Sequence, residues 1–231
     1  PLLLIGPPGC GKSMLLERLA QALRLRYRHY NASLVNFDEV FGFPVPNAER
    51  TGIVHLRASE SIWDAQCVFI DELSRCRPEM ANRFFSMIHE RRIGGQALPE
   101  LRFRWSAMNP PPKPDGDEDH ACLGAMPLDA ALADRFAWVV PMPAVGDLDA
   151  PTRLQLLRAT RSTAVQAADV TELVAQTRAI ANASSDRDVA DAWASALVGP
   201  LRDAGWPLTC RRMAMLASNA VWVGAAAQVL H

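Results

Sequence analysis

Eight consecutive residues near the start of the chain, GPPGCGKS, have the types and spacing of a loop that binds phosphate groups. They fit the pattern G-x-x-x-x-G-K-[ST], in which backbone amides surround the phosphates at a helix N-terminus. The lysine supplies positive charge to the outer phosphates, and the serine hydroxyl can ligate Mg²⁺. A chance lysine in a glycine-rich turn is disfavoured, because the chain has only two lysines. The predicted nucleotide contacts are Gly6, Pro7, Pro8, Gly9, Cys10, Gly11, Lys12, Ser13 and Met14.

Two adjacent acids, Asp71 and Glu72, follow an apolar run that is typical of a buried strand. In a phosphate-loop protein an acid at a strand end can hold Mg²⁺ through water, and a neighbouring glutamate can orient and deprotonate the attacking water. We therefore assign Mg²⁺ binding to Asp71 together with Ser13, and the role of general base to Glu72. The alternative is an acidic helix N-cap without chemistry, and the presence of Lys12 makes it the weaker interpretation.

Three further polar residues lie where they could reach a nucleotide. Asn109 follows another apolar strand and could contact the γ-phosphate or the attacking water; otherwise it is an ordinary turn residue. Arg135 precedes the last predicted strand and could reach a phosphate, and its alternative is a surface ion pair with Asp134. Arg211 lies near the start of the final predicted helix and could contact nucleotide from there, although arginines at helix ends are often only solvated.

The elements that must position these residues alternate between apolar strands and helical patterns. This alternation predicts an α/β fold with a parallel sheet. The apolar residues after the phosphate loop recur at helical spacing, so strand, loop and helix follow in the required order. The helix after Pro78 has an apolar stripe that we expect in the core. The predicted strands are residues 2–5, 32–35, 67–70, 103–108 and 137–140.

Strand patterns stop near residue 145, and alanine-rich helical patterns take over. We therefore expect a nucleotide-binding α/β domain over residues 1–145 and a small all-helical domain over residues 146–231. Because Pro1 already enters a strand, we expect that the sequence is a fragment. The predicted helix starts in the second part are Asp169 with Glu172, Ser185 with Asp188, and Thr209.

Three segments of the first part are predicted loops. Residues 42–51 are rich in proline and glycine, and either project a hairpin or simply connect elements. Residues 91–101 suggest a second hairpin. Residues 110–124 include three alternating aspartates, but an EF-hand is excluded because its sixth position is His120 and its twelfth is Met126. A solvated loop is the better interpretation of this acidic segment.

Composition excludes several classes of protein. The formal net charge of −1 gives no overall basic field for nucleic acid. Five scattered cysteines, none spaced C-x-x-C, indicate neither a disulfide framework nor a zinc site and favour a reducing compartment, the cytoplasm. The longest apolar stretch lies near the end of the chain, and its alanine content and polar interruptions favour a packed helix over a membrane span.

The motifs resemble those of a known family. GPPGCGKS, VFIDEL, AMNP, LADRF and TCRR are similar, in order and spacing, to the phosphate loop, Walker B, sensor 1, arginine finger and sensor 2 of AAA+ ATPases. FDEVFGFP, DELSRCRPEM, MIHERRI and MPLDAALADRF resemble the MoxR group, most of all its RavA-like members. The resemblance covers nearly the whole chain and makes residues 42–51 an insert in the second helix and 91–101 the hairpin before sensor 1. TCR stands where many relatives have Ser-Pro-Arg, so Arg211 and Arg212 are both candidates for sensor 2.

The resemblance implies a ring, usually a hexamer, that hydrolyses ATP to ADP between subunits with Mg²⁺. Such rings remodel or activate a partner protein, often one with a von Willebrand A domain. A small-molecule phosphate-loop kinase is an alternative that leaves Asn109, Arg135 and the helical region unexplained. A nucleotide-dependent assembly switch with little hydrolysis would be distinguished by measured turnover, and a nucleic-acid motor by stimulation of the ATPase by DNA.

Overall fold

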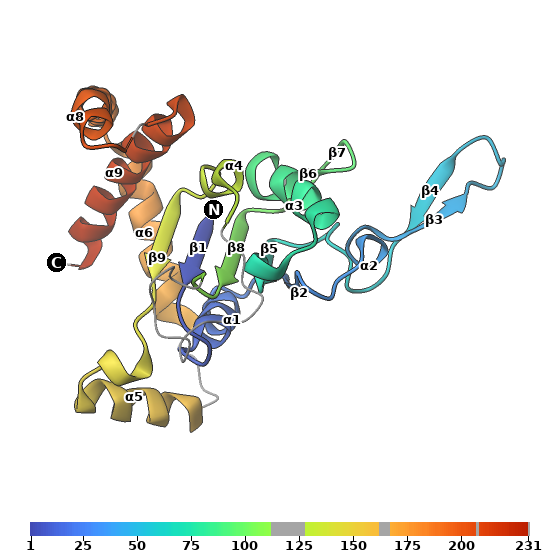
Figure 1. The fold of residues 1–231 in the computed structure, drawn as a ribbon, viewed down its shortest axis with the longest axis horizontal. Coiled ribbons are helices and arrows are strands. Elements are labelled where there is room, and N and C mark those ends of the chain that lie inside the picture. Colours follow the sequence, from blue (N-terminus) through green and yellow to red (C-terminus); the bar gives the residue numbers. More distant parts are fainter. Residues whose placement is uncertain (112–127, 162–166, 207, 231) are drawn as a thin grey trace.

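The computed structural model describes residues 1–111, 128–161, 167–206 and 208–230. A five-stranded sheet forms the centre of the chain, in the order β2-β5-β8-β1-β9 (Figure 1). All neighbouring strands are parallel, which confirms the predicted α/β class. The strands are β1 (Leu2–Ile5), β2 (Tyr27–Asn31), β5 (Cys67–Asp71), β8 (Phe103–Met108) and β9 (Trp138–Pro141). Their carboxyl ends form one edge of the sheet, so whatever follows β1, β5 and β8 is brought together there.

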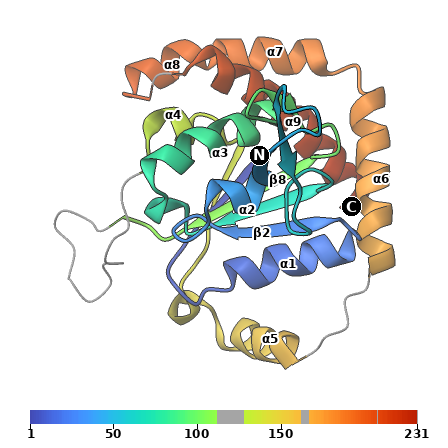
Figure 2. The ribbon, with the colours of Figure 1, turned by 90° about the vertical axis from the view of Figure 1, so that its right-hand side faces the viewer.

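Helices cover both faces of this sheet (Figure 2). On one face α1 (Lys12–Ala22) packs Leu16 and Ala20 against Phe69 and Trp105 of the sheet. On the other face lie α2 (Phe37–Phe41), α3 (Pro78–Glu90) and α4 (Ala130–Ala133), with the short 3₁₀ helix η1 (Leu73–Arg75) after β5. The predicted apolar stripe of α3 is confirmed, because its members are all buried: Met80, Phe84, Met87 and Ile88.

Two small hairpins extend the side of the sheet that carries β2. The longer one, β3 (Phe43–Pro46) with β4 (Ile53–Leu56), projects away from the rest of the chain (Figure 1). Residues 42–51 therefore belong to a hairpin that extends to Leu56, and are not a simple connection. Gly42 has φ +106° and a Cβ there would lie 2.6 Å from the carbonyl oxygen of Leu56, so the chain can enter the hairpin closely only with glycine.

The shorter hairpin joins β6 (Arg92–Ile93) to β7 (Gln96–Ala97) and confirms the second predicted hairpin. Only its tip is free of the core, because Ile93, Leu98 and Leu101 are buried. A Cβ on Gly94 would lie 2.8 Å from the ring of Phe41, in the helix that leads into the longer hairpin. The turn of the shorter hairpin therefore packs against α2.

The predicted strand at 32–35 is wrong. The second strand comes earlier, over Tyr27–Asn31, and its exposed positions hold polar side chains because β2 is an edge strand with one neighbour. After it the amides of Leu34 and Val35 donate to the carbonyl of Asn31, which closes a turn over residues that look apolar enough for a strand. The last strand is one residue later than predicted, and the acidic segment that includes His120 lies outside the described residues.

The described chain beyond η3 (Val145–Asp147) contains only helices, which confirms a C-terminal helical region; the domain boundary at 145 stays a prediction. Helices α6 and α7 pack against α9, and α8 follows α7, whereas α5 lies apart from them near α1 (Figures 1 and 2). The helices are α5 (Ala150–Arg161), α6 (Ala167–Ala183), α7 (Arg187–Ala196), α8 (Val198–Asp203) and α9 (Cys210–Leu230).

The predicted helix starts in this region meet different outcomes. Thr209 caps α9, since its hydroxyl oxygen accepts from the amide of Arg212 at 3.1 Å. The N-cap position of α7 is held by Asp186, one position after the predicted Ser185, and its side chain makes no capping hydrogen bond. Asp169 is not an N-cap, because α6 already begins at Ala167.

Within the part of the chain that the structure describes, α9 is the one helix long and apolar enough to cross a membrane by length and composition. Only 11% of its apolar window is buried inside the chain. One face of α9 nevertheless packs against α6 and α7, and Asn219 donates to the carbonyl of Ala137 at 2.8 Å. The helix is thus joined to the sheet through a polar contact midway along its length.

Candidate functional site

The phosphate loop connects β1 to α1 at the carboxyl edge of the sheet. Gly9 and Gly11 have φ angles of +76° and +87°, in the left-handed region that favours glycine. Gly6 is needed for a different reason, because a Cβ there would lie 2.7 Å from the Cβ of Met142, just after β9. Gly11 precedes the first residue of α1, Lys12, so the amides of the first helical turn face the loop.

Lys12 holds the loop together from inside. Its ammonium donates to the carbonyl oxygens of Gly6 at 2.7 Å and Pro7 at 2.9 Å, and to Oδ1 of Asn109 at 3.1 Å. Both Lys12 and Asn109 are buried, although 97 residues separate them. They meet because β1 and β8 are paired, with Ile5 opposite Met108. The structure therefore brings the predicted phosphate lysine and the predicted sensor asparagine into direct contact.

The two predicted Mg²⁺ ligands also meet. Oγ of Ser13 donates to Oδ2 of Asp71 at 2.8 Å, and Nε2 of His29 lies 3.6 Å from the same oxygen. Burial raises the pKa of Asp71, but hydrogen bonds from His29, Ser13 and the Glu72 amide outweigh it and lower that pKa below its usual value. A hydroxyl beside an ionised carboxylate is a donor set that Mg²⁺ prefers, so these two residues fit the ion.

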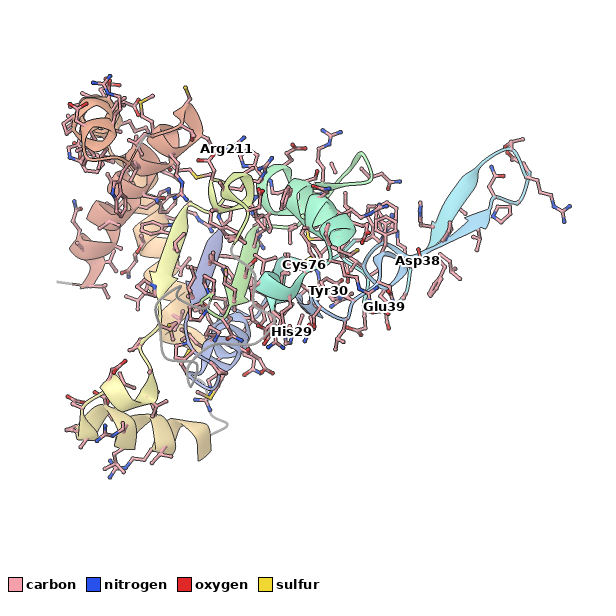
Figure 3. All side chains as sticks on the ribbon, viewed as in Figure 1. His29, Tyr30, Asp38, Glu39, Cys76 and Arg211 are labelled. Carbon is pink, nitrogen blue, oxygen red and sulfur yellow. The ribbon has the colours of Figure 1, made fainter. Side chains whose placement is uncertain are left out.

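His29 is a site residue that sequence reasoning missed. It lies on β2 two residues before Asn31, the register partner of Asp71, and its ring stacks on Phe69 at 4.6 Å between centroids (Figure 3). The alternating segment YRHYN contained the signal for a strand that carries His29. Its role in the site became recognisable only once this strand was placed beside the strand that carries Asp71.

Glu72 adopts a backbone conformation that is uncommon for a residue other than glycine, with φ 54° and ψ 37°. It stands at the N-cap of η1, yet its side chain makes no capping hydrogen bond there. Among the described residues its buried Oε2 has no hydrogen-bond partner, and Nε of Arg75 lies 3.5 Å from it. The structural role as a helix cap is therefore not fulfilled, which favours a chemical role for this carboxylate.

Arg135 lies at the amino ends of the strands, just before β9 begins, and thus at the edge of the sheet opposite the phosphate loop. Its Nη1 donates to the carbonyl of Ala131, and its guanidinium lies 5.0 Å from the centre of the Phe85 ring. The alternative ion pair with Asp134 does not form. The described ion-pair partners of Asp134 are Arg211, with Nη1 2.6 Å from Oδ2, and Arg212, with Nε 3.5 Å from Oδ1.

Arg211 does not lie beside the phosphate loop of its own chain. This differs from the expectation that it contacts a nucleotide bound at that loop. It is held by Asp134 at the edge where β9 begins, whereas the loop follows the opposite end of the parallel strand β1 (Figures 1 and 3). The reason is the position of α9, whose first turn sits on the end of α4. Arg135 and Arg211 thus share one edge, and the loop, Asp71, Glu72 and Asn109 share the other.

Comparisons with known proteins agree with this fold. The family described as AAA domain (dynein-related subfamily) matches residues 1–136. The crystal structure of a "putative ATPase" from Cytophaga hutchinsonii has the same fold, with a TM-score of 0.64 and 17% identity over 98% of this chain and 71% of that one. No curated protein matches the chain significantly. Because the family match spans more than half of the chain and runs from the phosphate loop to Arg135, the chain belongs to the dynein-related subfamily of AAA domains.

Proposed function

We propose that this chain is an ATP-hydrolysing subunit of MoxR type that works in a homo-oligomeric ring, a hexamer, and remodels or activates a partner protein. The observation that carries the proposal is the placement of charged groups at opposite edges of one parallel sheet. Lys12, Asp71 and Glu72 lie at the carboxyl edge, and Arg135 lies at the amino edge. One chain cannot present both sets to one nucleotide, whereas two neighbouring chains in a ring can.

In this proposal each residue has a chemical role. Lys12 exchanges its loop carbonyls for the outer phosphates of ATP, and Asn109 orients the attacking water or the γ-phosphate. Ser13 and Asp71 hold Mg²⁺, which when bound neutralises charge on the phosphates. Glu72 accepts the proton of the attacking water. Arg135 of the neighbouring subunit then stabilises the charge on the transferred phosphate.

The partner is proposed to be a protein client or adaptor, such as one with a von Willebrand A domain, by similarity to MoxR-type proteins. The projecting hairpin supports this, because one face of it carries exposed apolar side chains that include Phe43, Val54 and Leu56. We also place the ring in the cytoplasm, and the free thiols of Cys10, Cys67, Cys76 and Cys210 fit a reducing compartment.

A mixing experiment tests the proposed division of the site. A Lys12→Ala subunit cannot bind ATP but still offers its arginine, whereas an Arg135→Ala subunit binds ATP but offers none. Neither should hydrolyse ATP alone, since loss of such an arginine costs about 10³–10⁵ in rate. Mixed rings should recover activity in proportion to interfaces that combine the two intact halves. Inactive mixtures in which mass photometry shows mixed rings, or an active Arg135→Ala monomer, would refute the trans-acting role.

A further inference from the structure

The first half of α9, together with Thr209 just before it, is hydrogen-bonded to the turn that carries Arg135. Thr209 Oγ1 donates to Oδ1 of Asp134 at 2.7 Å, and Arg211 Nη1 donates to Oδ2 of the same carboxylate at 2.6 Å. Arg212 Nη2 donates to the carbonyl of Ala133 at 2.7 Å. Together with the bond from Asn219 to the carbonyl of Ala137, the helical region contacts the chain on both sides of Arg135. All these contacts are made to a segment of five residues, 133–137.

The Asp134 carboxylate is the centre of this network. Both of its oxygens are used, one by a hydroxyl and one by a guanidinium, and its side chain is only 15% exposed, so the charge-assisted bond is partly shielded from water. Thr209 ties the network to α9 itself, because the same hydroxyl caps that helix. Displacing α9 therefore pulls directly on Asp134.

Residues 133–137 have little conformational freedom to adjust when α9 is displaced. Phe136 is fully buried, the amide of Arg135 donates to the carbonyl of Leu132 at 3.0 Å, and Trp138 immediately enters β9. The backbone of Arg135 is thus fixed between a buried ring on one side and the Asp134 network on the other. A shift of the network changes where the Arg135 guanidinium can reach.

We propose that Asp134 is a positioning residue that couples the helical region to Arg135, so that the placement of α9 in one subunit sets the rate of hydrolysis in the neighbouring subunit. The proposal rests on the trans-acting role of Arg135 proposed above. Asp134 acts through the arginine and makes no contact with nucleotide itself. Loss of its charge should misplace the guanidinium, and a displacement of about 1 Å at a reacting group can cost about 10²-fold in rate.

The test uses the mixed rings and changes only the subunit that donates the arginine. Lys12→Ala donors mixed with Arg135→Ala acceptors give the reference activity. Donors that carry Lys12→Ala and Asp134→Asn should restore about 10²-fold less activity, and Asp134→Glu should recover part of the loss. The matched control is a Lys12→Ala donor with Asp203→Asn, which changes an exposed aspartate of α8 and should equal the reference.

A second arm separates positioning from a merely structural role. Adding Asp134→Asn to the Arg135→Ala acceptor should cost no further activity, because that subunit has no arginine left to position. If the acceptor loses activity as well, Asp134 supports the subunit's own site and the proposal is wrong. If Asp134→Asn fails to fold, Thr209→Val in the Lys12→Ala donor removes the bond to Asp134 and the N-cap of α9 at an exposed position. Both changes loosen α9 from Asp134, so the activity restored should fall below the reference.

The two proposals fail in distinguishable ways. If the Lys12→Ala donor restores nothing, the trans-acting role of Arg135 is refuted, and the coupling through Asp134 falls with it. If that donor restores activity and its Asp134→Asn version restores just as much in rings of the same composition, only the coupling is refuted.

Discussion

At the scale of single residues, Lys12 makes the most direct prediction. Its ammonium is buried and bonded to two loop carbonyls and Asn109, so Lys12→Ala removes both the charge for the outer phosphates and the groups that satisfy the loop. ATP binding measured by calorimetry should be lost. The nucleotide-free protein should also lose about 1–3 kcal/mol of stability, because buried acceptors lose their donor. An ATP affinity equal to that of the wild type would contradict the assignment of the loop.

Glu72 separates binding from chemistry. Glu72→Gln keeps the shape of the side chain and removes the base, so ATP should still bind while turnover falls by about 10²–10⁴. Glu79→Gln is the matched control, since Glu79 is an exposed acid in the first turn of α3 and its loss should leave turnover unchanged. Normal hydrolysis in Glu72→Gln would make Glu72 a structural acid only.

The sequence predicted the residues of this site better than it predicted their partners. The phosphate loop is recognisable because its pattern is local, and Ser13 meets Asp71 where parallel strands end, as their shared role toward Mg²⁺ requires. The direct bond between Lys12 and Asn109 was not predicted, although both residues lie at the same edge. The partner of Arg211 is Asp134, 77 residues away, and no local pattern reports how a helix will lie on a sheet. The position of Arg211 at the far edge could therefore not be predicted.

At the scale of elements, burial decides which strands a sequence reveals. β5 and β8 lie inside the sheet with helices on both faces, so most of their residues are apolar: β5 is a continuous apolar run up to Asp71, and β8 is interrupted only by Arg104 and Ser106. Both strands were predicted within one residue. β2 lies at an edge, where polar side chains are tolerated, and was missed in favour of the apolar turn after it. Hairpin β3–β4 could only be suggested, because proline and glycine allow a turn without specifying its length.

The longer hairpin should be separable from hydrolysis. Its strands pair only with each other, and its base is anchored by the His55 ring, 4.2 Å from that of Phe41. Replacing residues 46–53 with a two-residue turn should keep His55 in place, so basal ATPase and the melting temperature should stay near wild type while stimulation by a protein client is lost. Loss of ATPase together with folding would show that the tip belongs to the core.

A deletion in the shorter hairpin should destabilise the protein if it extends beyond the tip. Residues 91–101 include buried Ile93, Leu98 and Leu101, so deleting the whole segment would remove core packing as well as a surface loop. Exposed Gln96 at the tip is the better place to test partner coupling, because a Cβ on Gly94 would lie 2.8 Å from the Phe41 ring and Gly95 has a φ of +81°.

At the scale of the whole molecule, the separation of charges predicts assembly that depends on nucleotide. In the proposed ring, ATP bound at the carboxyl edge of one subunit would attract Arg135 at the amino edge of the next, so Glu72→Gln protein, which should retain ATP, is expected to form rings when ATP is added. Lys12→Ala protein should not respond. Mass photometry with and without ATP checks this, and a single-subunit mass under both conditions would refute assembly between these edges.

The sulfur of Cys10 has a consequence for following the molecule in solution. This half-exposed thiol lies inside the phosphate loop, with Sγ 3.7 Å from the ammonium of Lys12. A nucleotide that draws Lys12 onto its phosphates would also cover the thiol, so alkylation of Cys10 by iodoacetamide should slow when ATP is added. Peptide mass spectrometry can measure this at Cys10 separately from exposed Cys210, and Lys12→Ala protein should show no protection. The chain therefore carries its own footprinting probe of nucleotide occupancy, one that needs no attached label.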